Sequence, residues 1–270
     1  MMPHWTRPAA TALALLLLPA AAASDTIDCV MDPALAVKLG AAVPGLLDEV
    51  LVDRGDEVRA GQIVARLSST VERETERLIE MQAENDSALE AQRARVGFLL
   101  QRLERTRALA DRGVATIDLL QEIEAEVEVG RSLLRQAEMD QAIARQDLVR
   151  TRAAIALREI RSPVDGLVVA RHLAPGEYLQ SEAQIVTIVT LDPLHVEAFL
   201  PVSMFGRVRV GDSALVWPSV PFVSGHPATV VVVDRLFDAA SGTFGVRLEL
   251  PNPGLALPAG HRCVVEFSAS

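Results

Sequence analysis

The spacing of apolar residues predicts a long helical hairpin in the middle of the chain. From about residue 70 to 158 there is no proline, and apolar residues recur at alternating steps of three and four. A heptad pattern sustained in this way on two successive arms is typical of a coiled coil. Arg112 and Gly113 interrupt the pattern once, as a turn would. We therefore predict an antiparallel coiled-coil hairpin over residues 69–158, with its tip at residues 111–116.

The same pattern predicts which residues of the two arms face each other. Symmetry about the tip pairs seam residues whose numbers add up to 226, so that Asn85 meets Gln141. Because one buried polar pair can set the register of a coiled coil, we predict that these two residues lock the hairpin. The predicted seam comprises Val71, Thr75, Leu78, Gln82, Asn85, Leu89, Gln92, Val96, Leu99, Leu103, Thr106 and Ala110 on the first arm, and Leu120, Ile123, Val127, Gly130, Leu134, Ala137, Gln141, Ala144, Leu148, Thr151 and Ile155 on the second.

Two stretches that flank the hairpin resemble each other. One begins at Gly45 and the other at Gly166, and each has a second glycine ten residues later. With one inserted residue, Gln62–Val64 then matches Gln184–Val186. Alternating apolar positions bounded by glycine predict short strands. Two copies of a unit too small to bury its own face are expected to pack together as a pair.

These patterns predict an elongated α+β chain. Residues 45–68 and 159–190 form the two halves of one β domain, and the hairpin interrupts it. Residues 24–44 supply an N-terminal strand segment. Apolar runs bounded by Gly, Pro, Asp or Ser over residues 191–270 predict a small antiparallel β-barrel.

Composition and motifs argue against several classes of function. The formal charge of -10 makes nucleic acid an unsuitable partner. The chain has no GxSxG, HExxH, CxxC or GxGxxG motif, and its five histidines show no metal-ligand spacing. We therefore expect neither an enzyme nor a metal or cofactor site. A lipoyl or biotinyl carrier would need a lysine between its two halves, but the only lysine, Lys38, precedes the first half.

The N-terminus reads as a secretory signal. Arg7, the apolar run from Ala9 to Leu18 and the small residues at 21–23 predict a cleaved signal peptide over residues 1–23. The alternative, an uncleaved membrane anchor, is disfavoured because the apolar stretch is short of the roughly 20 residues that span a bilayer. In an oxidising compartment two cysteines tend to pair, so we expect a Cys29–Cys263 disulfide. Two free, buried thiols are the alternative.

The arrangement resembles the periplasmic adaptors, or membrane fusion proteins of the haemolysin D-like family, of tripartite efflux pumps. Three motifs carry the resemblance: Gly45 to Leu67, IRSPVDGLVV from Ile160 to Val169, and DAASGTFGVRLELPNPGLALPAG from Asp238 to Gly260. The resemblance implies a lipoyl-like domain split by the hairpin and followed by a β-barrel. The membrane-proximal domain of larger adaptors would be reduced or absent, because the sequence stops about ten residues after Gly260.

The resemblance also implies a function and partners. The chain would bridge an inner-membrane transporter of the resistance-nodulation-division (RND) type and an outer-membrane channel, within the periplasm. It would act as a ring of identical copies, with six as the expected number, and support the export of small molecules. The alternative is an adaptor of an ABC-type exporter or a type I secretion system.

Residues near the tip resemble a channel-docking motif. Adaptors that dock outer-membrane channels share an Arg, a Leu four residues later and a Ser seven residues after that. Arg105, Leu109 and Thr116, next to the turn at Gly113, have these spacings. Arg105 and Leu109 also continue an outer stripe that begins at two further residues of the same helix face, Phe98 and Arg102. The alternative is a set of scattered surface side chains.

Overall fold

The computed structural model describes residues 26–180, 182–222 and 224–267. The chain divides into two compact units, Leu35–Leu191 and a second made of Met1–Ala34 with Asp192–Ser270. The predicted signal peptide, residues 1–23, lies outside the described residues. The α+β class is confirmed in its coarse form, because one long helical hairpin is combined with β-sheets.

The unit Leu35–Leu191 is built from short strands on either side of the hairpin. The strands of the first half are β2 (Gly45–Val50), β3 (Glu57–Val58) and β4 (Ile63–Leu67). Those of the second half are β5 (Glu159–Arg161), β6 (Gly166–Arg171) and β7 (Tyr178–Leu179). Two longer strands, β1 (Thr26–Leu39) and β8 (Val186–Pro201), begin in one unit and end in the other.

The two halves of this unit exchange strands. β2 of the first half pairs with β7 of the second, and β3 of the first pairs with β6 of the second. The hydrogen bonds repeat at equivalent positions: Gly55 N donates to Val168 O over 2.8 Å, and Gly176 N donates to Leu47 O over 2.8 Å. Each equivalent pair of residues differs by 121 in number. The halves are therefore related by a local pseudo-twofold symmetry, and each completes the sheets of the other.

The same symmetry corrects the repeat alignment. Leu51 N donates to Val64 O over 2.8 Å, and His172 N donates to Ile185 O over 2.8 Å. Val64 is therefore equivalent to Ile185 rather than to Val186, and the predicted inserted residue is wrong. Both halves contain the sequence Gln-Ile-Val, but the two copies are 122 residues apart, whereas the equivalent hydrogen bonds are 121 residues apart. Matching the identical residues therefore introduces an insertion that the structure does not have.

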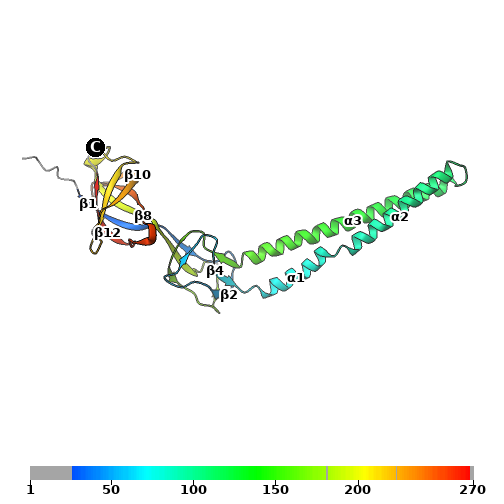
Figure 1. Cartoon of the computed structure of the whole chain (residues 1–270), viewed down its shortest axis with the longest axis horizontal. Coiled ribbons are helices and arrows are strands. Elements are labelled where there is room, and N and C mark those ends of the chain that lie inside the picture. The colour runs from blue at the N-terminus through cyan, green and yellow to red at the C-terminus, as the bar shows by residue number, and fades with distance from the viewer. Residues whose placement is uncertain (1–25, 181, 223, 268–270) are drawn as a thin grey trace, which may run out of the picture. The chain divides into compact units, whose positions relative to one another are not determined.

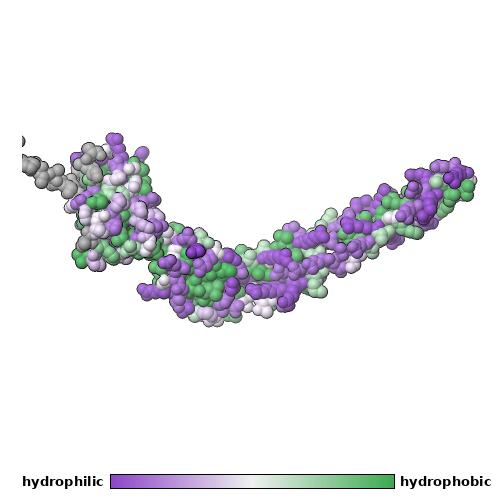
Figure 2. Space-filling model, viewed as in Figure 1, coloured by the Kyte–Doolittle hydropathy of each residue, from purple (hydrophilic) through white to green (hydrophobic). Residues whose placement is uncertain are grey.

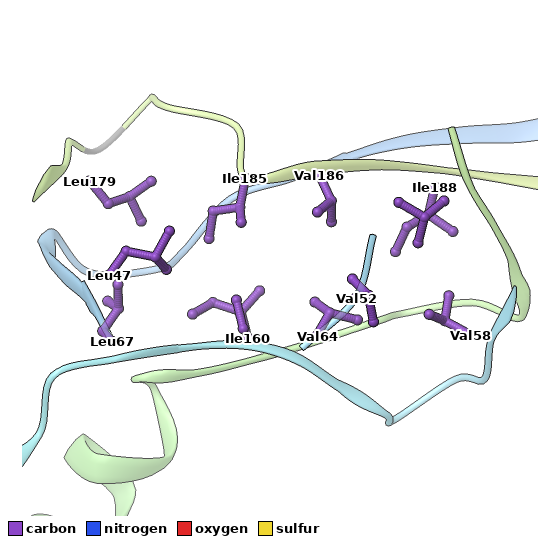
Figure 3. Packing of buried hydrophobic residues seen from close by; sticks show 12 residues of the cluster. Leu47, Val52, Val58, Val64, Leu67, Ile160, Leu179, Ile185, Val186 and Ile188 are labelled. Carbon is purple, nitrogen blue, oxygen red and sulfur yellow. The ribbon is translucent and has the colours of Figure 1, made fainter. Parts of the chain in front are cut away.

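Both halves contribute equivalent side chains to one hydrophobic core. Figure 3 shows Leu179, Ile185, Val186 and Ile188 facing side chains of the opposite layer. The fully buried members keep the offset of the repeat. They are Leu47 with Val168, Val58 with Leu179, Val64 with Ile185, Ala65 with Val186, and Leu67 with Ile188. Burial of a side chain of this size stabilises the fold by about 1.5–3 kcal/mol, so the core favours the exchanged arrangement.

The hairpin is inserted between β4 and β5, and its first arm is broken. That arm consists of α1 (Thr70–Glu84) and α2 (Ser87–Ala110), whereas the second arm is the single helix α3 (Ile117–Ala156). α3 packs against both α1 and α2 (Figure 1). None of the described helices is long and apolar enough to cross a membrane.

The predicted seam is correct for α3 and α2 and wrong for α1. Every predicted seam residue of α3, from Leu120 to Ile155, is buried or half-buried, and so is every one from Leu89 to Ala110. In α1, however, Val71 and Leu78 are 75% and 57% exposed. The side of α1 that faces α3 instead carries Glu72, Glu76, Ile79, Glu80 and Ala83.

The second unit is an antiparallel sheet in which a disulfide links two neighbouring strands. Its strand order is β1-β12-β9-β10-β11-β8, and β1 also pairs with β8. Opposite residues of β1 and β12, Cys29 and Cys263, are joined by a disulfide with an S–S distance of 2.11 Å. The remaining elements of this unit are β9 (Ser213–Pro218), β10 (His226–Asp238), β11 (Thr243–Leu250), β12 (His261–Phe267) and the 3-10 helices η1 (Val202–Met204) and η2 (Pro253–Leu255).

The pseudo-twofold pair Gly45 and Gly166 allows a matched test of the core. A Cβ at Gly166 would collide with the backbone carbonyl of Val189, whereas a Cβ at Gly45 would lie 3.4 Å from the flexible Cδ1 of Leu67. We expect Gly166→Ala to lower the free energy of unfolding by about 1–3 kcal/mol, and Gly45→Ala by less than about 1 kcal/mol. Urea unfolding followed by circular dichroism measures both. Equal losses would contradict this account of the asymmetry.

Candidate functional site

The half of the hairpin nearest the tip is held by a hydrophobic seam. Val96, Leu99 and Val127 are buried, as is Gly130 of α3. A Cβ at Gly130 would lie 3.0 Å from Leu99 Cδ1 and 3.5 Å from Val96 Cγ2, so the missing side chain allows the helices to approach closely. This contact agrees with the predicted register in this half.

Ion pairs between α2 and α3 flank the seam close to the tip. Arg102 Nη1 donates to Glu126 Oε2 over 2.9 Å, and Arg107 Nη2 donates to Glu124 Oε1 over 2.6 Å. Arg102 is therefore turned towards α3. The prediction that Arg102 belongs to an outer stripe is therefore wrong, because its charge is paired with Glu126 of the other arm.

The turn at the tip is closed by the backbone. Leu109 O accepts hydrogen bonds from Val114 N over 2.9 Å and from Ala115 N over 3.3 Å. Gly113 has a φ of 74°, a left-handed conformation that suits glycine. Thr116 is the N-cap of α3, and its hydroxyl accepts from Leu119 N over 3.2 Å. The Thr116 oxygen thus has a structural role in addition to the proposed contact role.

An exposed surface of mixed character surrounds this turn. Leu109 is 43% exposed, and Val114 and Ile117 are 72% and 71% exposed. Arg105 is exposed and makes no ion pair with any described residue. Figure 2 shows hydrophobic residues among hydrophilic ones at this end of the hairpin. We call Arg105, Leu109, Val114, Thr116 and Ile117 the tip surface.

The sequence identified only part of the tip surface. The resemblance to channel-docking adaptors predicts Arg105, Leu109 and Thr116. Leu109 and Thr116 lie at the two ends of the turn, and Arg105 lies in the last turns of α2 before it. Phe98 is 59% exposed but lies farther down α2. The prediction from the sequence does not include Val114 and Ile117 in this surface. One apolar residue before and one after Thr116, close to a turn that faces solvent, nevertheless indicate a contact surface.

The predicted Asn85–Gln141 lock is not a buried pair. Asn85 ends α1 in an extended conformation, is exposed, and accepts hydrogen bonds from Ser87 N over 3.1 Å and Ser87 Oγ over 2.7 Å. The break between α1 and α2 therefore removes Asn85 from the seam. Asn85 and Gln141 nevertheless line the same hollow of about 410 Å³ between the arms.

The half of the hairpin nearest the β-strands is held by charges. Arg152 donates to Glu76 Oε1 over 2.8 Å and to Glu80, and Arg158 donates to Glu72. The hydrogen bond to Glu76 raises the pKa of Arg152 above its ordinary value, and the negative charges of Glu80 and Glu76 act in the same direction. Arg158 also donates to Ser68 O over 2.7 Å, which ties the base of α3 to the end of β4.

No group of three or more His, Cys, Asp or Glu side chains that could hold a metal ion occurs among the described residues. The described part of the chain can be classified by its architecture. Its features are a β domain of strand-exchanged halves, a helical hairpin inserted between them and an exposed tip. They define a barrel-sandwich hybrid domain with an inserted hairpin.

The chain belongs to the family with the CzcB-like barrel-sandwich hybrid domain, whose model matches residues 36–190. This match confirms the family resemblance drawn from the sequence. The matched range begins and ends at the unit Leu35–Leu191, and it includes both halves and the hairpin.

Relatives of known name agree with this assignment. The cobalt-zinc-cadmium resistance protein CzcB of Cupriavidus metallidurans is 26% identical over 219 residues, which cover 78% of this chain and 38% of that protein. The cation efflux system protein CzcB of an Alcaligenes species gives the same identity and coverage. The chain thus matches well under half the length of these curated relatives.

Solved structures share the fold. The structure of MacA from Actinobacillus actinomycetemcomitans superposes with a TM-score of 0.75 at 17% identity, covering 90% of this chain and 78% of that chain. The membrane fusion protein Spr0693 of Streptococcus pneumoniae gives a TM-score of 0.57 at 17% identity, with 92% and 100% of the two chains covered.

The cap formed by Thr116 can be separated from any role in docking. Thr116→Ala removes the acceptor for Leu119 N, and losing such a cap costs about 1 kcal/mol. We expect hydrogen exchange at the first turn of α3 to accelerate about fivefold, as measured by mass spectrometry. Thr116→Ser, which keeps the hydroxyl, should exchange as the wild type does. Unchanged exchange in Thr116→Ala would show that the cap does not hold this turn.

Proposed function

We propose that this protein is a periplasmic adaptor that connects an inner-membrane efflux transporter with an outer-membrane channel. The observation that carries the proposal is the inserted hairpin with its exposed tip, in a chain that belongs to the CzcB-like family. In this proposal the strand-exchanged unit is the lipoyl-like domain and the sheet from β8 to β12 is the β-barrel domain of an adaptor.

The proposed role requires binding rather than catalysis. The tip surface combines apolar side chains with the positive charge of Arg105, which has no ion pair among the described residues, and this composition suits a protein contact. It is the proposed site for the outer-membrane channel. Copies of the chain would assemble into a ring, with six as the expected number, because head-to-tail contacts that close on themselves generate rings.

The disulfide supports a periplasmic location. Such bonds persist in oxidising compartments, including the bacterial periplasm, and are rare in the cytosol. The Cys29–Cys263 bridge therefore fits a protein that is exported, as the signal peptide proposed for residues 1–23 requires.

The names of the relatives favour divalent metal cations as the first cargo to test. One relative is a cobalt-zinc-cadmium resistance protein and another belongs to a cation efflux system. An RND-type transporter is the proposed inner-membrane partner. Selection of the cation would then belong to that transporter, and the adaptor would complete the path to the channel.

The tip surface is the place to test this function. We expect Arg105→Asp with Leu109→Asp to abolish export, because the double change places two negative charges where the channel would bind. Both side chains are exposed, so thermal unfolding and helix content should stay at wild-type values. The measurement is growth of a complemented deletion strain on zinc, cobalt and cadmium, together with the metal content of its cells.

Ile143→Asp with Arg145→Asp is the matched control. It makes the same change of charge at an exposed apolar and an exposed arginine side chain of α3, away from the tip. We expect this variant to retain export. Full resistance in the tip variant would refute the docking role, and co-purification with an ABC-type exporter or a type I secretion system instead of an RND-type transporter would refute the proposed class.

A further inference from the structure

The first arm of the hairpin carries two faces that could each pack against α3. The observed face consists of Glu72, Glu76, Ile79, Glu80 and Ala83. The second face is the heptad stripe of Val71, Thr75, Leu78 and Gln82, which is exposed in the structure. The two faces differ by one residue along the helix, which is a rotation of about 100°.

The exposed stripe continues the seam of α2 without interruption. Its spacing leads from Gln82 through Asn85 to Leu89, and Leu89 is buried against α3. At the break between the helices, at Asn85 and Asp86, the heptad stripe stops facing α3. Asp86 makes no side-chain cap for α2, so the start of this helix lacks the hydrogen bond that usually holds an N-terminus.

The opposite helix already presents the positions that the exposed stripe would meet. Leu148 and Ile155 of α3 are half-buried, and both belong to the same seam as the fully buried Val127. In the register of the tip half, Leu148 would meet Leu78 and Ile155 would meet Val71. Both pairs would then bury apolar surface that is now exposed to solvent.

The hollow beside the break shows that packing is incomplete there. It is about 410 Å³ in volume and is lined by Gln82, Asn85, Leu89, Gln92 and Gln141, among others. Gln92 Oε1 is buried and accepts no hydrogen bond from the described residues. A buried acceptor without a donor is costly. Asn85 and Gln82 line the same hollow, and they carry amide groups that could become donors if α1 rotates.

From these observations we infer that the first arm is bistable. In one state α1 is broken from α2, Glu76 and Glu80 pair with Arg152 of α3, and Glu72 pairs with Arg158 just after α3. In the other, α1 rotates and joins α2 in one continuous helix whose seam includes Val71, Leu78 and Asn85. The switch sets whether the hairpin is interrupted or continuous, independently of which partners it binds.

Salt should shift the balance between the two states. The ion pairs involve partly exposed side chains, with Arg152 52% exposed, and such pairs weaken as ionic strength rises. The apolar seam does not depend on charge and is not weakened in this way. High salt is therefore expected to favour the continuous helix.

A disulfide trap tests the inference in the full chain, with the native disulfide left intact. We expect Leu78→Cys with Leu148→Cys to crosslink under mild oxidation. The yield of crosslinked protein should rise severalfold as NaCl is raised to about 1 M, where the Debye length is only about 3 Å. Leu99→Cys with Val127→Cys occupies the same heptad positions in the tip half and should crosslink at every salt concentration. A control pair that crosslinks while the 78–148 pair never does would overturn the inference.

A variant that removes the charges of the ion pairs provides a second test of the same inference. Glu76→Gln with Glu80→Gln removes both partners of Arg152, and it should raise the 78–148 yield at low salt to the level seen at high salt. Glu104→Gln with Glu122→Gln makes the same change at residues without an ion pair among the described residues, and it should have no effect. An unchanged yield in the first variant would count against the ion pairs as the holding force.

Maleimide labelling of single cysteines gives a readout without crosslinking. Leu78→Cys should label several times more slowly at high salt than at low salt, because the seam state buries position 78. Arg77→Cys is the control, since the Arg77 side chain is 77% exposed and position 77 lies on the outer side of α1 in either state. Equal rates at the two positions across all salt concentrations would overturn the inference even if the crosslinking variants failed to fold.

Discussion

The strand exchange between the two halves is the constraint on which the rest of the structure depends. Because β2 pairs with β7 and β3 with β6, neither half has a complete sheet until the other is in place. The shared core, with Leu47 and Val168 as equivalent members, makes this pairing favourable. The ends of β4 and β5 are thereby brought together, and they define where the two arms of the hairpin begin. Arg158 reinforces that junction by binding Ser68 O.

The hairpin combines two kinds of packing. Near the tip, buried Val96, Leu99 and Val127 form an apolar seam that tolerates only glycine at position 130 without adjustment. Near the base, acidic residues of α1 face Arg152 and Arg158. Partly exposed ion pairs contribute about 0–1 kcal/mol each, less than buried apolar side chains. The tip half therefore has the firmer internal support, which suits the proposed docking role of the tip surface.

The sequence was sufficient where a single periodicity decides the packing. The heptad pattern predicts the seam of α3 residue by residue from Leu120 to Ile155, because that pattern runs through the whole helix without a break. The predicted seam of α1 is wrong because a second, acidic face of this helix forms ion pairs with Arg152 and Arg158. The spacing of apolar residues does not show which of the two faces is more stable against α3. The repeat was recognised, but its offset required the hydrogen bonds of Val64 and Ile185. The prediction of the tip surface is incomplete because Val114 and Ile117 belong to no periodic pattern.

The position of the disulfide has a topological consequence. Cys29 and Cys263 are 234 residues apart, so the bridge turns most of the chain into one covalent ring that includes the whole hairpin. A single cut at Gly113 would open this ring without producing two molecules. The separated arms would remain attached, each through its own half of the β domain, to the same bridged pair of strands. Cleavage in the turn at the tip of the hairpin would therefore release no fragment.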